Sequence, residues 1–283
     1  MSMNRVILSV IIALSLLTLV LHGCGGGTSI QNELEMVPGL CFLHVHVSEN
    51  MDIDLIPEGF SEFLPLWLCD SLIVRGSFGV SLLGINLTDF TPQLLFLSRG
   101  LEMDGMLQLG KDGFHCSSEE SQQCFDLIDD RGSMIGSIAS RDGWTCLITG
   151  SGSDRSARNW LELGKEESLA SDPELISISE SDADLTLLVS QNTIAFISVI
   201  PTGMLSRAQV TMLGRVKNLI QEINPKALMI SLDITAEEPP VITLELQLVR
   251  DGDNVTSFSV SFSDTEFTAE NLLLIISDGG FLF

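Results

Sequence analysis

Residues 6–21 form an uninterrupted apolar or hydroxyl run, and the short leader before it carries one basic side chain, Arg5. A basic leader followed by an apolar stretch is the pattern of a secretory signal peptide. The run is shorter than the roughly 20 residues that a helix needs to cross a hydrocarbon core, which favours a cleaved signal over a permanent helix. We therefore predict that residues 1–23 are a signal peptide and take no part in the fold.

The apolar run ends at Leu21-His22-Gly23-Cys24. This segment resembles the lipobox of bacterial lipoproteins, which has a large aliphatic residue at position −3 and a small residue at position −1. Position −2 is usually small in that motif and is His22 here. The resemblance implies cleavage between Gly23 and Cys24, and a covalent lipid with palmitate-type acyl chains on Cys24 as the only prosthetic group.

Two alternatives to the lipobox are an ordinary signal peptide and an uncleaved anchor helix, with Cys24 incidental in both. All three place the rest of the chain outside the cytoplasm. Acyl chains contribute about 0.8 kcal/mol per buried CH₂, so two or three of them would hold the protein at a membrane. Residue 25 is Gly rather than the Asp that retains many lipoproteins at the inner membrane, so the resemblance implies the outer membrane in a diderm organism. Residues 24–36 begin with a glycine run and are predicted to be a flexible tether.

The charge balance limits what the chain can bind. It has 38 Asp and Glu residues against 14 Lys and Arg residues, a formal net charge of −24. Such a surface repels the phosphates of nucleic acids and of anionic lipids. We therefore expect neither nucleic-acid binding nor electrostatic binding to a membrane. The predicted membrane contact is therefore through the lipid anchor alone, and an envelope protein is the expected kind of partner.

The body of the chain is predicted to be α+β, with two related modules of antiparallel sheet and packed helices over 37–165 and 166–283. Strand-like runs at 40–47 and 184–190 open the two halves, and the polar stretch 164–182 with Pro173 separates them. The other predicted strands are 73–83, 93–98, 124–128, 133–140, 144–150, 227–234, 241–249 and 255–262. The predicted helices lie within 54–72, 101–113, 153–163, 202–223 and 266–276.

Three short pieces of the body resemble a family of uncharacterised bacterial anchored proteins. They are VPGLCFLHVHV at 37–47, RDGWTCLITGS at 141–151 and SDPELISISESDADLTLLVS at 171–190. The resemblance implies tandem α+β modules and says nothing about chemistry.

Besides Cys24 the chain has five cysteines. Cys116 and Cys124 flank a polar loop and could form a short disulfide in an oxidising compartment. The sequence contains no C-x-x-C motif, so a zinc ribbon or a thioredoxin-type redox site is not expected.

His44 and His46 lie two residues apart on a predicted strand, so both imidazoles point to the same side and could share a metal ion. A third ligand would have to come from His115 or from a carboxylate elsewhere in the chain. The alternative is that the two histidines are polar residues on the less buried face of an amphipathic strand. We predict no resident metal, and keep His44 and His46 as the candidate ligands.

Other motifs favour structural roles. The segment 251–254 (DGDN) suits a hairpin turn better than a calcium loop, and 150–154 (GSGSD) suits a helix cap at Ser153 and Asp154 better than a phosphate cradle. No G-x-S-x-G motif occurs. The sequence thus predicts a non-enzymatic binding or envelope-structural lipoprotein. The alternatives are a metal-dependent envelope hydrolase using His44 and His46, and a carrier of apolar molecules.

Overall fold

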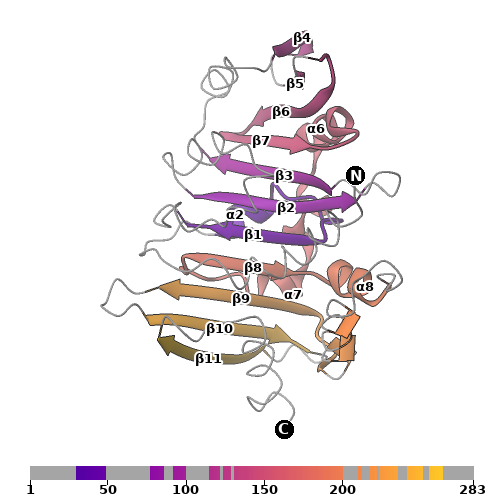
Figure 1. The fold of residues 1–283 in the computed structure, drawn as a ribbon. Helices are drawn as coiled ribbons and strands as arrows, with labels where there is room; N and C mark the ends of the chain where they lie inside the picture. The colour runs from indigo at the N-terminus through magenta and orange to yellow at the C-terminus, as the bar shows by residue number, and fades with distance from the viewer. Residues whose placement is uncertain are drawn as a thin grey trace.

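A single antiparallel sheet dominates the computed structural model (Figure 1), which describes residues 30–48, 77–85, 92–99, 115–121, 124–128, 131–199, 223–234, 241–250 and 255–263, with scattered helical positions between 210 and 221. Its eleven strands run in the order β11-β10-β9-β8-β1-β2-β3-β7-β6-β5-β4. The strands are β1 Leu43–Val47, β2 Phe78–Ile85, β3 Pro92–Arg99, β4 His115–Ser121, β5 Cys124–Ile128, β6 Met134–Arg141, β7 Trp144–Thr149, β8 Leu185–Val189, β9 Ala227–Ile234, β10 Val241–Val249 and β11 Val255–Ser263.

The predicted fold class, α+β with two separate modules, is wrong. Strand β1 from the first half of the chain pairs antiparallel with β8 from the second half, with Val45 opposite Leu187. The same β1 pairs with β2 on its other edge, so the two halves share one uninterrupted hydrogen-bonded sheet. The described residues are therefore mainly β, and the two halves do not form separate sheets.

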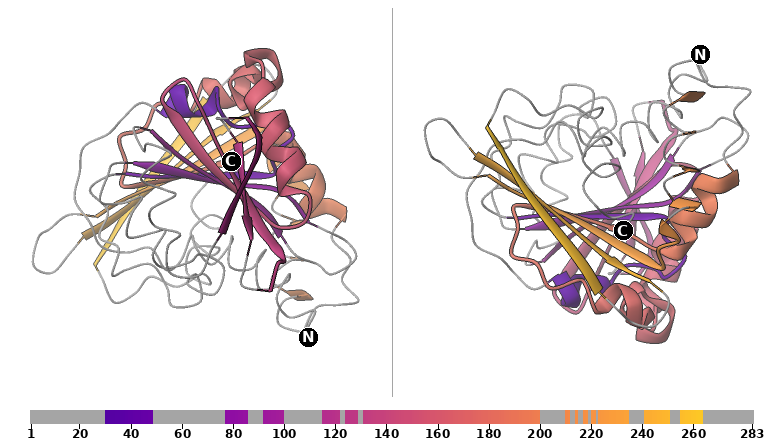
Figure 2. Two further views of the ribbon diagram at one scale, coloured as in Figure 1. Left: turned by 90° about the horizontal axis from the view of Figure 1, so that it is seen from above. Right: turned by 90° about the horizontal axis from the view of Figure 1, so that it is seen from below.

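Helices cover part of one face of this sheet. They are α2 Ile30–Leu34, α6 Ser153–Glu162, α7 Pro173–Ile176 and α8 Gln191–Val199, with the short 3₁₀ turns η3 Lys165–Glu167 and η4 Leu169–Ser171. Helix α6 packs across β5, β6 and β7, α7 contacts β9, and α2 contacts η4. Figure 2 shows how strongly the strands twist across the sheet beneath these helices.

The central strands are buried on both faces. On the face of α2 and α6 the core contains Leu95, Cys146, Trp160, Leu188 and Met229, each at most 1% exposed. The alternate residues of the same strands, such as Val45, Phe96 and Leu147, are buried as well. Strands buried on two sides lose the simple alternation of apolar and polar residues, which explains the apolar runs within β3 and β8. Strand β10, nearer the edge of the sheet, keeps the alternation.

Several local predictions are confirmed. Strands β5, β7, β9 and β10 coincide with predicted runs to within one residue, and α6 occupies the predicted helix. Asp142 and Gly143 form the two-residue turn between β6 and β7, with φ values of 53° and 77° that suit an Asp-Gly hairpin. The predicted cap is wrong: Gly152, in left-handed conformation, is the N-cap of α6, and no side chain caps the helix.

Residues assigned to the tether are partly structured. Within 24–36, residues 30–34 form α2, and Ile30 and Leu34 are buried. The signal peptide, Cys24, and the predicted helices at 54–72, 101–113 and 266–276 lie outside the described residues, as does the turn at 251–254. In the part of the chain that is described, no helix is both long and apolar enough to span a membrane.

Candidate functional site

A buried carboxylate lies between α2 and the centre of the sheet. Helix α2 presents one apolar stripe to the sheet, formed by Ile30, Leu34 and, just beyond its end, Val37. Glu33 lies on the same stripe and is only 2% exposed. A carboxylate removed from water in this way requires polar partners, because an unpaired buried charge is costly.

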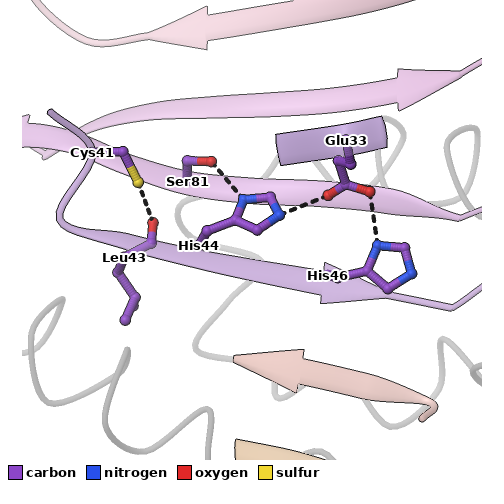
Figure 3. Close-up of polar contacts among 6 residues, drawn as sticks. All are labelled: Glu33, Cys41, Leu43, His44, His46 and Ser81. Atoms are coloured by element: carbon purple, nitrogen blue, oxygen red, sulfur yellow. Dashed lines mark hydrogen bonds and ion pairs between the residues drawn. The ribbon is translucent and has the colours of Figure 1, made fainter. Parts of the chain in front are cut away.

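Two histidines of β1 supply those partners. His44 and His46 point to the α2 side of the sheet and are 0% and 2% exposed. Figure 3 shows both rings directed at the Glu33 carboxylate. His46 Nδ1 lies 2.7 Å from Glu33 Oε2 and donates a hydrogen bond to it. His44 Nε2 lies 2.8 Å from Glu33 Oε1, an ion-pair distance whose angle is poorer than that of a well-directed hydrogen bond.

Ser81 fixes the orientation of the His44 ring. Its Oγ lies 2.8 Å from His44 Nδ1, and Ser81 is fully buried on β2, directly opposite His44. The ring satisfies both neighbours when Nε2 carries the hydrogen facing Glu33 and Nδ1 accepts from the serine hydroxyl. In this tautomer the Ser81 hydroxyl donates to His44, and the Nε2 hydrogen of His44 faces the Glu33 carboxylate.

Gly79 provides the space that the carboxylate occupies. It lies on β2 opposite His46. A Cβ atom at this position would lie 1.9 Å from Glu33 Oε1 and 2.8 Å from His44 Cε1. The Glu33 carboxylate can therefore occupy this position only because residue 79 has no side chain.

The charges of the site reinforce each other. Burial opposes ionisation of Glu33, but the charge of His46 and the contacts with both rings outweigh it and lower the pKa of Glu33 from 4.5 to about 2. Burial likewise opposes protonation of His46, and the Glu33 carboxylate outweighs it, so the pKa of His46 is raised above 6.5. The Glu33–His46 contact is thus an ion pair at mildly acidic pH, between the ordinary pKa values of the two groups.

The prediction for His44 and His46 is confirmed in one respect and corrected in another. Both imidazoles do point to one side of a strand, and a third polar group, Glu33, does join them. They are not on a less buried face, because α2 covers them. The sequence signal for Glu33 was an acid inside an apolar i, i+4, i+7 stripe, in a segment that we predicted to be a tether.

The arrangement is suited to holding α2 rather than to binding a metal ion. The nitrogen that each histidine directs into the site already contacts a Glu33 oxygen. Among the described residues, no group of three or more His, Cys, Asp or Glu side chains is placed to hold a metal. The side chain of His115, the other suggested ligand, is outside the described part of the chain.

The described cysteines are free thiols. Cys124 is unpaired, so the Cys116–Cys124 disulfide is not formed; the register of β4 and β5 places Cys116 opposite Leu127 and Cys124 opposite Ser121. Cys41 is buried and donates to the carbonyl of Leu43 at 3.0 Å (Figure 3), and burial raises its pKa to about 12. These thiols are therefore protonated at neutral pH, and Cys41 is enclosed by the core.

A groove of about 800 Å³ lies between the turn at 38–41, helix α6 and η3. Its walls combine apolar side chains, such as Leu83 and Leu163, with the carboxylates of Glu162 and Glu166. Leu40, at its edge, is 81% exposed. Charged and apolar groups are mixed here, unlike the lining of a dedicated carrier of apolar molecules.

Comparisons with known protein families, with curated proteins and with solved structures find no match to this chain.

Proposed function

We propose that the protein is a bacterial lipoprotein of the extracytoplasmic envelope, anchored by a lipid on Cys24, and that its body is a non-enzymatic binding or structural unit. The observation that carries the proposal is the N-terminal sequence: a basic leader, an apolar run of signal-peptide length, and Leu21-His22-Gly23-Cys24. In this proposal the glycine run at 25–27 links the cysteine to the folded body.

The charge of the chain supports a covalent anchor. With a formal net charge of −24, the protein is repelled by anionic lipid headgroups. A lipid on Cys24 holds the chain at a membrane regardless of this repulsion, because its binding energy comes from buried CH₂ groups. The acidic body then faces the aqueous side of the envelope.

The buried network supports a non-enzymatic body. Glu33, His44 and His46 form a buried cluster of titratable side chains, and each is at most 2% exposed. Their polar atoms contact one another and Ser81, through hydrogen bonds and one ion-pair contact, so the cluster is directed inward and not towards a substrate. A hydrolase that used His44 and His46 would need them open to a substrate.

Processing of Cys24 tests the anchor. We expect the Cys24→Ala variant to accumulate as an unprocessed precursor that takes up no radiolabelled palmitate. The native chain treated with globomycin, which blocks cleavage after lipid attachment, should accumulate as a precursor that is labelled. Cys124→Ala is the matched control, because it also removes a free thiol, and it should be processed and labelled normally. Normal maturation of Cys24→Ala would refute the lipoprotein assignment.

Metal analysis distinguishes the proposed non-enzymatic body from the alternative, a metal-dependent hydrolase. If His44 and His46 held a catalytic metal, the native protein would purify with a stoichiometric divalent ion that His44→Gln/His46→Gln loses. We expect the same metal content, near zero, in both proteins.

A further inference from the structure

Glu33 and the groups that hold it belong to different parts of the fold. Each oxygen of its carboxylate contacts one histidine of β1, at 2.8 Å for His44 and 2.7 Å for His46. The carboxylate itself comes from α2, a helix of five residues. Both oxygens of one carboxylate are thus contacted by nitrogens from a single strand, one through a charge-assisted hydrogen bond from His46 and one at ion-pair distance from His44.

The receiving surface is built entirely into the sheet. His44 lies opposite Ser81, and His46 opposite Gly79, on the adjacent strands β1 and β2. Ser81 orients one ring, and the missing Cβ of Gly79 leaves the space that the carboxylate fills. Because β1 pairs with β2 and also with β8, these positions are fixed by backbone hydrogen bonds on both sides of β1.

We propose that His44, His46, Ser81 and Gly79 form a carboxylate-binding site, specific for a small aliphatic carboxylate, which Glu33 occupies as an intramolecular ligand. In this arrangement α2 is a bound segment whose docking depends on one side chain in addition to its apolar contacts. The assignment does not depend on the lipid anchor, since every group in it belongs to the folded body.

Truncation of Glu33 allows the site to be tested with a free ligand. Glu33→Ala removes a fragment the size of acetate and leaves the receiving groups unchanged. In the full-length protein, purified in detergent at pH 6.0, we expect Glu33→Ala to melt at a lower temperature than the native chain. Added acetate should then raise its Tm in a saturable way and recover at least half of the loss.

Four comparisons make the result specific. Sodium chloride at equal ionic strength and the neutral isostere acetamide should produce little recovery. Glu35→Ala, on the residue two positions along, is the matched control, because Glu35 is 38% exposed and pairs with surface Lys165; its Tm should not respond to acetate beyond the response to chloride. Glu33→Ala/His46→Ala should lose the acetate response, since one of the two grasping nitrogens is gone.

The proposal is overturned if acetate and chloride act equally on Glu33→Ala, or if the double variant responds as strongly as the single one. If Glu33→Ala does not fold unaided, the same additives are supplied during refolding from urea. A refolded yield that increases with acetate and not with chloride supports the site, and a yield that acetate leaves unchanged refutes it.

Discussion

Gly79 is the residue whose size matters most to the buried network. A methyl group there would overlap Glu33 Oε1, and the two oxygens of this carboxylate are held by His44 and His46. We expect Gly79→Ala to lower the free energy of unfolding by about 1–3 kcal/mol, the usual cost of overpacking a core, because Glu33 must move away from its partners. Urea denaturation followed by circular dichroism measures the change.

Gly84→Ala is the control for this prediction. Gly84 lies on the same strand, β2, and a Cβ atom there would have no neighbour within 4 Å. Its substitution should change stability by less than about 0.5 kcal/mol, or slightly increase it, since alanine loses less backbone freedom on folding. Equal losses at the two positions would show that the space at Gly79 is not needed.

The Glu33–His46 pair gives stability a defined pH dependence. The pKa of Glu33 is lowered in the folded state, so its contribution is present above 4.5 and is lost as pH falls towards 2. The pKa of His46 is raised, so its contribution is complete below 6.5 and is lost as pH rises through the raised value. The network therefore stabilises the fold most between pH 4.5 and 6.5.

Comparison with Glu33→Gln isolates this effect. We expect the difference in unfolding free energy between the native chain and Glu33→Gln to be largest in that window, and to shrink on both sides of it. Other titratable groups near the network are surface Glu35 with Lys165, buried Asp184 before β8, and the Cys41 thiol, which stays protonated. These groups are present in both proteins, so their contributions to the difference in unfolding free energy largely cancel. A difference that stays constant from pH 3 to 9 would contradict the prediction.

The sequence identified two of the five residues of this site, His44 and His46. His44 and His46 could be recognised by residue type and by a spacing of two, since a strand places such residues on one side. Glu33 was missed, because the apolar stripe around it has only three members, Ile30, Leu34 and Val37, which is too few to distinguish a short helix from a tether. Gly79 and Ser81 join the site only through the register of β1 and β2, which residue types alone do not determine.

At the level of elements, Arg141 connects the end of β6 to the end of α6. Its Nη1 donates to the carbonyls of Leu161 at 3.1 Å and Leu163 at 2.7 Å, and its guanidinium lies 4.8 Å from the centre of the Trp160 ring. The last carbonyls of a helix have no partner within the helix, so this arginine acts as a cap.

Arg141→Lys should weaken that connection. A lysine keeps the charge but cannot donate to two carbonyls while stacking on an indole, so we expect a loss of about 1–2 kcal/mol in unfolding free energy. The midpoint of urea unfolding measures it. Arg155→Lys, at an exposed position of α6, is the control and should have no effect beyond error; a silent Arg141→Lys would mean that α6 is held by its apolar face alone.

Elements with strong local signals were predicted well. The Asp142-Gly143 hairpin and the strands on either side of it follow from turn chemistry that few other sequences satisfy. Strand β4 was missed because its residues, HCSSEES, have neither apolar alternation nor β-branched side chains. Pairing with β5 makes this segment a strand, and pairing partners are not visible in local sequence.

At the level of the whole molecule, the pairing of β1 with β8 decides the architecture. The two strand-like runs that suggested two modules are these two strands, lying side by side in antiparallel register. Sequence similarity between the two runs could indicate that they have equivalent places in the two halves of the chain. It could not indicate whether they begin two separate sheets or pair within one sheet. That outcome depends on long-range hydrogen bonds between residues more than a hundred positions apart.

A shared sheet should unfold as one unit. The tryptophans of the chain, Trp67, Trp144 and Trp160, all lie in its first 165 residues, whereas far-ultraviolet circular dichroism reports strands from both halves. We expect urea transitions followed by tryptophan fluorescence and by circular dichroism to have the same midpoint and slope. Midpoints that differ by more than about 0.5 M would indicate halves that unfold separately.

The central place of β1 also affects how the chain must fold during synthesis. Synthesis proceeds from the N-terminus at about 5–20 residues per second, so on the order of ten seconds or more separates the appearance of β1 from that of its partner β8. During that interval one edge of β1 has no final neighbour, and an open strand edge invites pairing with other chains. Contacts between segments so far apart in sequence also slow folding. Aggregation during production should therefore depend on how long β1 waits for β8, more than on the stability of the finished sheet.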